Sequence, residues 1–117
     1  MDNPLWPDFH EREFFNVGCS LSDMNPAFMD RLQMARRFAG VPFIINSAFR
    51  SVDYEKAHKR SGQSMHCLGR AVDIRCVDSG SRHKILNALL QCGFNGIGIA
   101  NTFIHCDDRS IPLIWLY

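Results

Sequence analysis

The clearest periodic pattern of apolar residues lies in the first third of the chain. Its members recur at the intervals of one face of an α-helix, and they are Phe28, Leu32, Ala35 and Ala39. Asn25 supplies a helix cap, and Pro26 suits the first helical position. Gly40 is typical of the residue that follows a helix. We therefore predict an amphipathic helix that begins at Asn25-Pro26 and ends at Gly40.

A second helical pattern begins after residues 78–81, where Asp, Ser and Gly interrupt the chain and cap a new helix. The apolar face of this helix consists of Ile85, Leu86, Leu89 and Leu90. Gly93 marks its end. Each of the two predicted helices has one apolar face, so each is expected to pack against the rest of the fold on one side.

Short apolar runs indicate β-strands. These runs are residues 41–47, 71–76, 96–99, 103–107 and 113–117. A three-residue gap separates the third run from the fourth, which predicts a hairpin. The succession of helix, strand, loop, strand, helix and three further strands indicates an α+β fold, with an antiparallel sheet and flanking helices.

The remaining segments divide the chain into an arm and one domain. Residues 1–8 contain two prolines and are interpreted as an N-terminal arm, and residues 9–117 as a single domain. A short helix or turn over residues 9–17 is expected to dock three aromatic side chains, Phe9, Phe14 and Phe15. Residues 48–65 are polar and irregular, and loops of that length in compact domains are usually functional.

Composition narrows the class of protein. Of the 117 residues, 46% are hydrophobic and 21% are charged, which is typical of a globular domain. The formal net charge of +1 predicts no nucleic-acid partner. The longest apolar runs are too short to span a membrane. We expect a monomer that neither binds nucleic acid nor inserts into a membrane.

The N-terminus and the cysteines bear on the cellular compartment. The first eight residues are acidic and lack an apolar core, so they do not resemble a signal peptide. The 5 cysteines are odd in number and include no CxxC pair, which favours reduced thiols over disulfides. We expect synthesis in the cytoplasm, with action outside the cell only after release by another route.

Asp73 is the charged residue whose predicted surroundings are most apolar. It lies in the apolar run 71–76, and a carboxylate in such a strand must be hydrogen-bonded, ion-paired or bound to metal. Gly69 would let the backbone bend so that the imidazole of His66 folds back over Asp73. His105 lies between apolar neighbours in another predicted strand. Two histidines and one aspartate form a three-ligand zinc site with the fourth position open.

Two alternatives to this zinc site stay open. The carboxylate could instead pair with Arg70 or Arg75, while His105 is hydrogen-bonded in the core. Cys67 and Cys106 each follow a histidine directly, so thiolate ligation is a rival. Neighbours on a strand point to opposite faces, which separates Cys106 from the metal of His105. Both cysteines are better interpreted as small core residues.

Three motifs occur in order along the chain. They are Ser47-x-x-Arg50-Ser51, then Ser64-x-His66-x-x-Gly69-x-Ala71-x-Asp73, then His105-x-Asp107-x-Arg109. This set resembles the zinc D-alanyl-D-alanine carboxypeptidase superfamily of bacterial and phage cell-wall peptidases, and in particular its short, single-domain, phage- or prophage-like branch. The second motif also resembles the zinc-binding half of hedgehog signalling domains, which share the fold. The resemblance covers residues 9–109.

The resemblance implies roles for individual residues. His66, Asp73 and His105 match the three zinc ligands of the superfamily. Arg50 matches the arginine that lies beside the scissile carbonyl or the substrate carboxylate, and a guanidinium suits both tasks because it stays charged and offers a planar fork. Ser64 matches a serine that lies by the substrate in relatives, although a serine before a tight bend is also an ordinary turn residue.

The general base is where the chain departs from the superfamily pattern. Several relatives carry a carboxylate three residues before the last histidine ligand, and Thr102 stands at that position here. Asp107 is the substitute candidate, because residues two apart on a strand share a face and Asp107 therefore lies beside His105. Its alternative role is to orient His105 or to pair with Arg109.

These observations predict a zinc metallopeptidase that hydrolyses peptidoglycan stem peptides next to D-amino acids. It would be either a D-Ala-D-Ala carboxypeptidase or an endolysin-like endopeptidase. Zn²⁺ is the expected cofactor, and peptidoglycan or its peptide precursors are the expected partner at the cell wall. The alternative is a non-catalytic, hedgehog-like or virion-associated zinc-binding interaction module, which the missing carboxylate at Thr102 favours.

Overall fold

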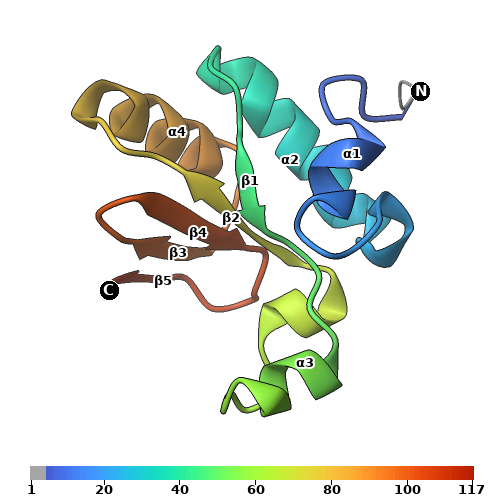
Figure 1. Ribbon diagram of the computed structural model, residues 1–117. Coiled ribbons are helices and arrows are strands. Elements are labelled where there is room, and N and C mark those ends of the chain that lie inside the picture. The colour runs from blue at the N-terminus through green and yellow to red at the C-terminus, as the bar shows by residue number, and fades with distance from the viewer. Residues whose placement is uncertain (1–4) are drawn as a thin grey trace.

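A computed structural model describes residues 5–117 of the chain (Figure 1). The helices are α1 (Glu11–Phe15), α2 (Pro26–Ala39), α3 (Val52–Ala57) and α4 (Ser79–Gln91), with short 3₁₀ turns at Leu21–Asp23 and Met65–Leu68. The strands are β1 (Ile45–Ser47), β2 (Ala71–Arg75), β3 (Gly96–Ile99), β4 (Phe103–Asp107) and β5 (Leu113–Leu116). The predicted α+β class is therefore confirmed.

The five strands form one sheet in the order β1-β2-β4-β3-β5. The first three neighbouring pairs are antiparallel, as predicted, but β5 runs parallel to β3, with Gly96 beside Leu113. The parallel direction of β5 follows from the position at which β4 ends. Asp107 lies opposite Gly96 at the start of β3, so a short connection delivers β5 to that same end of β3. The Asn95 side chain donates to the carbonyl of Arg109 at 2.9 Å and fixes this connection.

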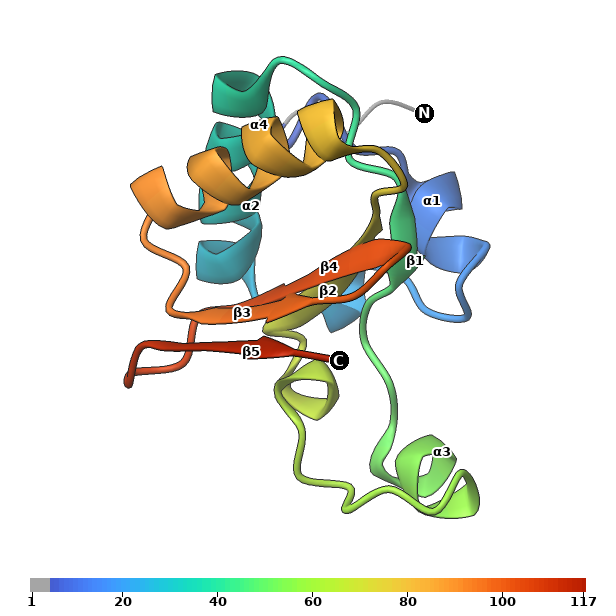
Figure 2. The ribbon, with the colours of Figure 1, turned by 90° about the vertical axis from the view of Figure 1, so that its left-hand side faces the viewer.

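Alternation along the strands gives the sheet one apolar and one polar face. The apolar face is buried and consists of Val72, Ile74, Ile97, Ile104 and Cys106. It joins the hydrophobic core, together with Phe28 of α2 and Leu89 of α4. Figure 2 shows α2 and α4 together on this side of the sheet and α3 on the other side. The opposite face is thereby left free for polar side chains.

The predicted caps of the two long helices are present. The Asn25 side chain accepts a hydrogen bond from the backbone N–H of Phe28 at 3.0 Å, and Gly40 ends α2 in the left-handed region, with φ of 70°. The Asp78 carboxylate accepts from the N–H of Ser81 at 2.8 Å at the start of α4. Both helix starts could be read from local sequence because each cap is completed within four residues.

Three predictions of local structure differ from what is observed. The segment 48–65 contains helix α3, which Ser51 caps by accepting from the N–H of Tyr54 at 3.0 Å. The predicted strand 41–47 is shorter, because only Ile45–Ser47 pairs with β2. Phe15 is 74% exposed rather than docked, whereas Phe9 and Phe14 are buried.

The N-terminal segment lies only partly within the described residues. Of the predicted arm 1–8, residues 1–4 are outside them. Trp6 is buried in the core, and its indole N–H donates to the Asp30 carboxylate at 2.8 Å. The division of the chain at residue 8 stays a prediction. All 5 cysteines lie within the described part and are free thiols. Between residues 5 and 117, no helix is both long and apolar enough to cross a membrane.

Candidate metal centre

His66, Asp73 and His105 converge on one point of the polar face of the sheet. One possible ligand atom from each side chain lies within 4.8 Å of the other two. Asp73 of β2 and His105 of β4 are directly opposite each other in the antiparallel pair. The His66 ring lies 5.2 Å from the His105 ring, between centroids. The structure therefore brings together the three residues that the sequence proposes as metal ligands.

His66 reaches the sheet because the turn that carries it ends in a tight bend. Gly69 adopts a left-handed conformation with φ of 67°, and a Cβ at this position would collide with the backbone carbonyl of Asp23. The N–H of Asn25 donates to the Gly69 carbonyl at 2.9 Å, which ties the bend to the start of α2. A side chain other than hydrogen at residue 69 would displace the turn and, with it, the imidazole of His66.

The hydrogen bond at Nδ1 of His66 leaves Nε2 available to bind a ligand. Its Nδ1–H donates to the Ala48 carbonyl at 2.7 Å, so in the neutral ring the free electron pair is on Nε2. Nε2 is buried, has no hydrogen-bond partner among residues 5–117, and lies 3.5 Å from an oxygen of Asp73. A buried polar atom without a partner is costly unless a ligand satisfies it. This donor set fits a divalent metal ion.

His105 is held at both ring nitrogens. Nε2 lies 2.7 Å from Oδ2 of Asp107, and Nδ1 lies 3.0 Å from Oδ1 of Asp73. Burial disfavours the imidazolium, but the hydrogen bonds of the two carboxylates outweigh this effect and raise the pKa of His105. Burial likewise opposes the charge on Asp73, yet the two imidazoles keep its pKa well below the usual range. The carboxylate therefore stays charged and suits a cation.

The alternative ion pairs of Asp73 are not formed. Arg70 instead donates through Nε to Asp108 at 2.8 Å, and Arg75 lies opposite Phe103 at the far end of β2. Cys106 is buried on the apolar face, opposite Val72, as strand alternation requires. The hydrogen-bond and ion-pair partners observed for Asp73 are the two histidines.

Asp107 is fully buried, and both of its oxygens are engaged. Arg109 donates through Nε to Oδ1 at 2.8 Å and through a terminal nitrogen to Oδ2 at 2.7 Å, while Oδ2 also contacts His105. Burial raises the pKa of Asp107, but Arg109 and His105 outweigh that effect and hold it far below its usual value. This arrangement favours the orienting role for Asp107 over the role of general base. Thr102, at the position of the missing carboxylate, is exposed.

Glu55 is a site residue that sequence reasoning missed. It lies in the segment 48–65, which the sequence predicts to be polar and irregular, yet Glu55 is 1% exposed and lies 3.1 Å from Nε of Arg50. Burial raises the pKa of Glu55, but the nearby polar side chains of Ser64 and Cys67 and the charge of Arg50 lower it below the ordinary value. No local pattern marks this residue, because its burial depends on how α3 packs.

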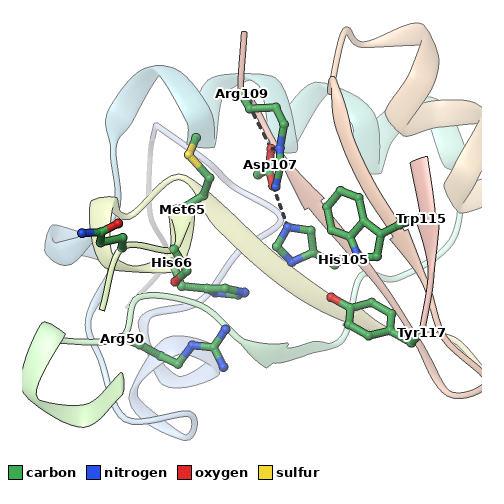
Figure 3. A pocket seen from close by; sticks show the side chains of 10 residues that line it. Arg50, Met65, His66, His105, Asp107, Arg109, Trp115 and Tyr117 are labelled. Carbon is green, nitrogen blue, oxygen red and sulfur yellow. Dashed lines mark hydrogen bonds and ion pairs between the residues drawn. The ribbon is translucent and has the colours of Figure 1, made fainter. Parts of the chain in front are cut away.

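An open cleft of about 440 Å³ lies beside the three converging side chains (Figure 3). Arg50 and His66 line one side, and His105, Trp115 and Tyr117 line the other. Ser64 also lines the cleft. The structure thus brings Arg50 and Ser64 to the same cleft as the metal donors. Trp115 and Tyr117 were predicted only as part of a final strand, and no sequence motif assigned them to the site.

Comparisons with known proteins bear on this arrangement. The profile of a family described as Peptidase M15 matches residues 10–107. Among solved structures, the L-Ala D-Glu endopeptidase ChiX of Serratia marcescens shares 20% sequence identity at a TM-score of 0.48, over 73% of this chain and 74% of that chain. No curated protein sequence matches the chain at a significant level.

Proposed function

Because the chain belongs to the peptidase M15 family, we propose that it is a metal-dependent peptidase that hydrolyses peptidoglycan stem peptides next to a D-amino acid. The observation that carries this proposal is the convergence of His66, Asp73 and His105 beside an open cleft. The three ordered motifs, which resemble those of cell-wall D,D-peptidases, support the class of substrate.

We assign the metal to Nε2 of His66, a carboxylate oxygen of Asp73 and Nδ1 of His105. A bound Zn²⁺ would supply Lewis-acid chemistry, which activates water and polarises the scissile carbonyl. Asp107 holds Nε2 of His105 and so presents Nδ1 to the metal side of the ring. Ala48 does the same for His66 through its carbonyl. Each imidazole is thus held in orientation by a partner outside the metal position.

Arg50 is the residue that we assign to substrate binding. Its ion pair with Glu55 uses Nε, and the terminal nitrogens point into the cleft (Figure 3). The other guanidinium at the cleft, that of Arg109, is occupied by Asp107. A planar fork of two N–H donors suits a carboxylate. This feature favours a substrate that ends in a free carboxylate close to the cleaved bond, as in a D-Ala-D-Ala carboxypeptidase, over an internal cut.

The test is to incubate the purified, zinc-loaded protein with the stem pentapeptide L-Ala-γ-D-Glu-L-Lys-D-Ala-D-Ala and to identify the products by mass spectrometry. Release of D-alanine that stops with a chelator, and in Asp73→Ala, is the expected result. A cut at an internal bond would replace the carboxypeptidase assignment with an endopeptidase. Failure to cleave this peptide or larger muropeptides, with one zinc per chain, would overturn the proposed hydrolysis.

A non-catalytic zinc-binding module is the second candidate. One observation favours it: the buried or half-buried carboxylates Asp73, Asp107 and Glu55 all have cationic or imidazole partners. None of them is positioned as a free proton acceptor. A module of this kind would bind zinc and the stem peptide without turnover, so the same incubation, combined with a binding measurement, separates the two candidates.

A further inference from the structure

We propose that Tyr117 contacts the substrate, and that its phenol donates a hydrogen bond to the carbonyl oxygen that gains negative charge during peptide hydrolysis. This inference rests on the proposed function, because it assigns a residue to the same reaction. It adds to the site a donor that no motif contains. Three features of the structure lead to it: the placement of β5, the glycine beneath it, and the direction of the phenol.

The parallel pairing of β5 with β3 brings Tyr117 to the polar face of the sheet. Trp115 lies beside Gly98 in that pairing, and the N–H of Tyr117 donates to the Ile99 carbonyl at 3.0 Å. The Tyr117 ring packs 5.0 Å from the Phe103 ring and 6.4 Å from the Trp115 ring, between centroids. Although 67% of the residue is exposed, its backbone and ring are both held in place.

Gly98 provides the space that the two aromatic rings occupy. A Cβ at this position would lie 2.6 Å from the indole nitrogen of Trp115 and 2.7 Å from a ring carbon of Tyr117. Such distances are too short for any side chain, so the absence of a side chain at residue 98 lets both rings lie against the sheet. The rings therefore form a wall of the cleft next to His105, which lies 5.3 Å from the Trp115 ring.

The phenol of Tyr117 points into the cleft. Figure 3 shows its oxygen directed toward the space between His105 and Arg50. Burial, Asp73 and Asp107 raise the pKa of Tyr117 and outweigh the opposing effects of the Trp115 indole and Arg50, so the phenol keeps its proton at neutral pH. A neutral O–H donor opposite a guanidinium is an arrangement that stabilises a developing oxyanion.

The experiment compares Tyr117→Phe with Tyr54→Phe, which changes the other tyrosine of the chain. Tyr54 lies on α3 and does not line the cleft. For Tyr117→Phe we expect kcat on the stem pentapeptide to fall about 100-fold, the effect of removing one oxyanion donor, with KM within about twofold. Zinc content should be unchanged, and Tyr54→Phe should match the unmodified chain.

A second measurement is independent of turnover. A phosphinate analogue of the terminal D-Ala-D-Ala unit carries the tetrahedral, charged oxygen, and its Kd is measured by calorimetry for both variants. We expect Tyr117→Phe to weaken this binding about as much as it lowers kcat. Unchanged kcat and Kd in Tyr117→Phe would overturn the inference and leave the proposed function intact. A loss of activity that merely follows a loss of zinc would overturn the inference in the same way. Absence of hydrolysis by the unmodified chain would overturn both.

Discussion

The Nε atom of Arg50 lies 3.1 Å from Oε2 of Glu55, and the Glu55 side chain is 1% exposed. The pair links α3 to the cleft, because Glu55 is a buried residue of α3 and Arg50 lines the cleft. A buried carboxylate is tolerated when a cation compensates it. The ion pair places the Nε side of the Arg50 guanidinium against Glu55, and the terminal nitrogens lie toward the cleft (Figure 3).

Replacing this buried carboxylate should cost both stability and activity. In Glu55→Gln the Arg50 guanidinium loses its anion, and breaking such a pair lowers the free energy of unfolding by about 3 kcal/mol. Urea unfolding measures this loss. We also expect kcat/KM to fall about 10-fold, because Arg50 would no longer be held toward the substrate. Asp53→Asn, at an exposed position of the same helix, is the matched control and should change neither quantity.

The lowered pKa of Glu55 predicts how the cost of Glu55→Gln depends on pH. A carboxyl whose folded-state pKa lies below its ordinary 4.5 stabilises the fold above that value and loses this contribution as pH falls through the folded pKa. The difference in unfolding free energy between the unmodified chain and Glu55→Gln should therefore be constant above about pH 5 and shrink in acid. Urea titrations from pH 3 to 7 measure it. A difference that grows in acid would contradict the assigned ion pair.

The two possible roles of Asp107 can be separated by Asp107→Asn. If Asp107 orients His105, as the two engaged oxygens favour, zinc affinity should fall about 10- to 100-fold together with activity. If it were the general base, activity would fall while zinc affinity stayed the same. Competition with a chromogenic chelator gives the affinity. Asp108→Asn, which removes only the charge that pairs with Arg70, should leave zinc affinity unaltered.

Gly98→Ala tests the aromatic wall of the cleft. The added methyl group would displace the Trp115 and Tyr117 rings, since it would lie 2.6 Å from Trp115 and 2.7 Å from Tyr117. We expect kcat/KM to fall at least 10-fold with zinc still bound, and the tryptophan fluorescence to change. Gly80→Ala is the control, because its nearest atom is 3.5 Å away and helix α4 favours alanine there. Equal effects of the two substitutions on kcat/KM would contradict a role for the Trp115 and Tyr117 rings in the cleft.

Local sequence predicted the parts of the fold that depend on local interactions. The caps at Asn25 and Asp78 and the glycine stop at Gly40 are completed within a few residues. The sequence placed Asp73 and His105 in two predicted strands, and the antiparallel pairing of β2 with β4 brings them together. The conformation of Gly69 then explains how His66 joins them. The set of converging side chains could therefore be found without coordinates.

The features that sequence did not predict depend on contacts between distant segments. Glu55 has polar neighbours along the chain, and its burial follows from the packing of α3 against the turn that carries His66. The parallel direction of β5 depends on where β4 ends relative to β3, so apolar patterning alone left Trp115 and Tyr117 without a role. The engagement of Asp107 by Arg109 became visible only when both side chains could be placed.

The aromatic wall and the metal donors come from separate segments of the chain. His66, Asp73 and His105 belong to the Met65–Leu68 turn, β2 and β4, whereas Trp115 and Tyr117 come from the last strand and its end. Changes in that final strand would reshape the opening through which a peptide approaches while leaving metal affinity intact. Selectivity for new peptides could thus be engineered, or acquired in evolution, by substitutions at Trp115 and Tyr117 that leave the three metal donors unchanged.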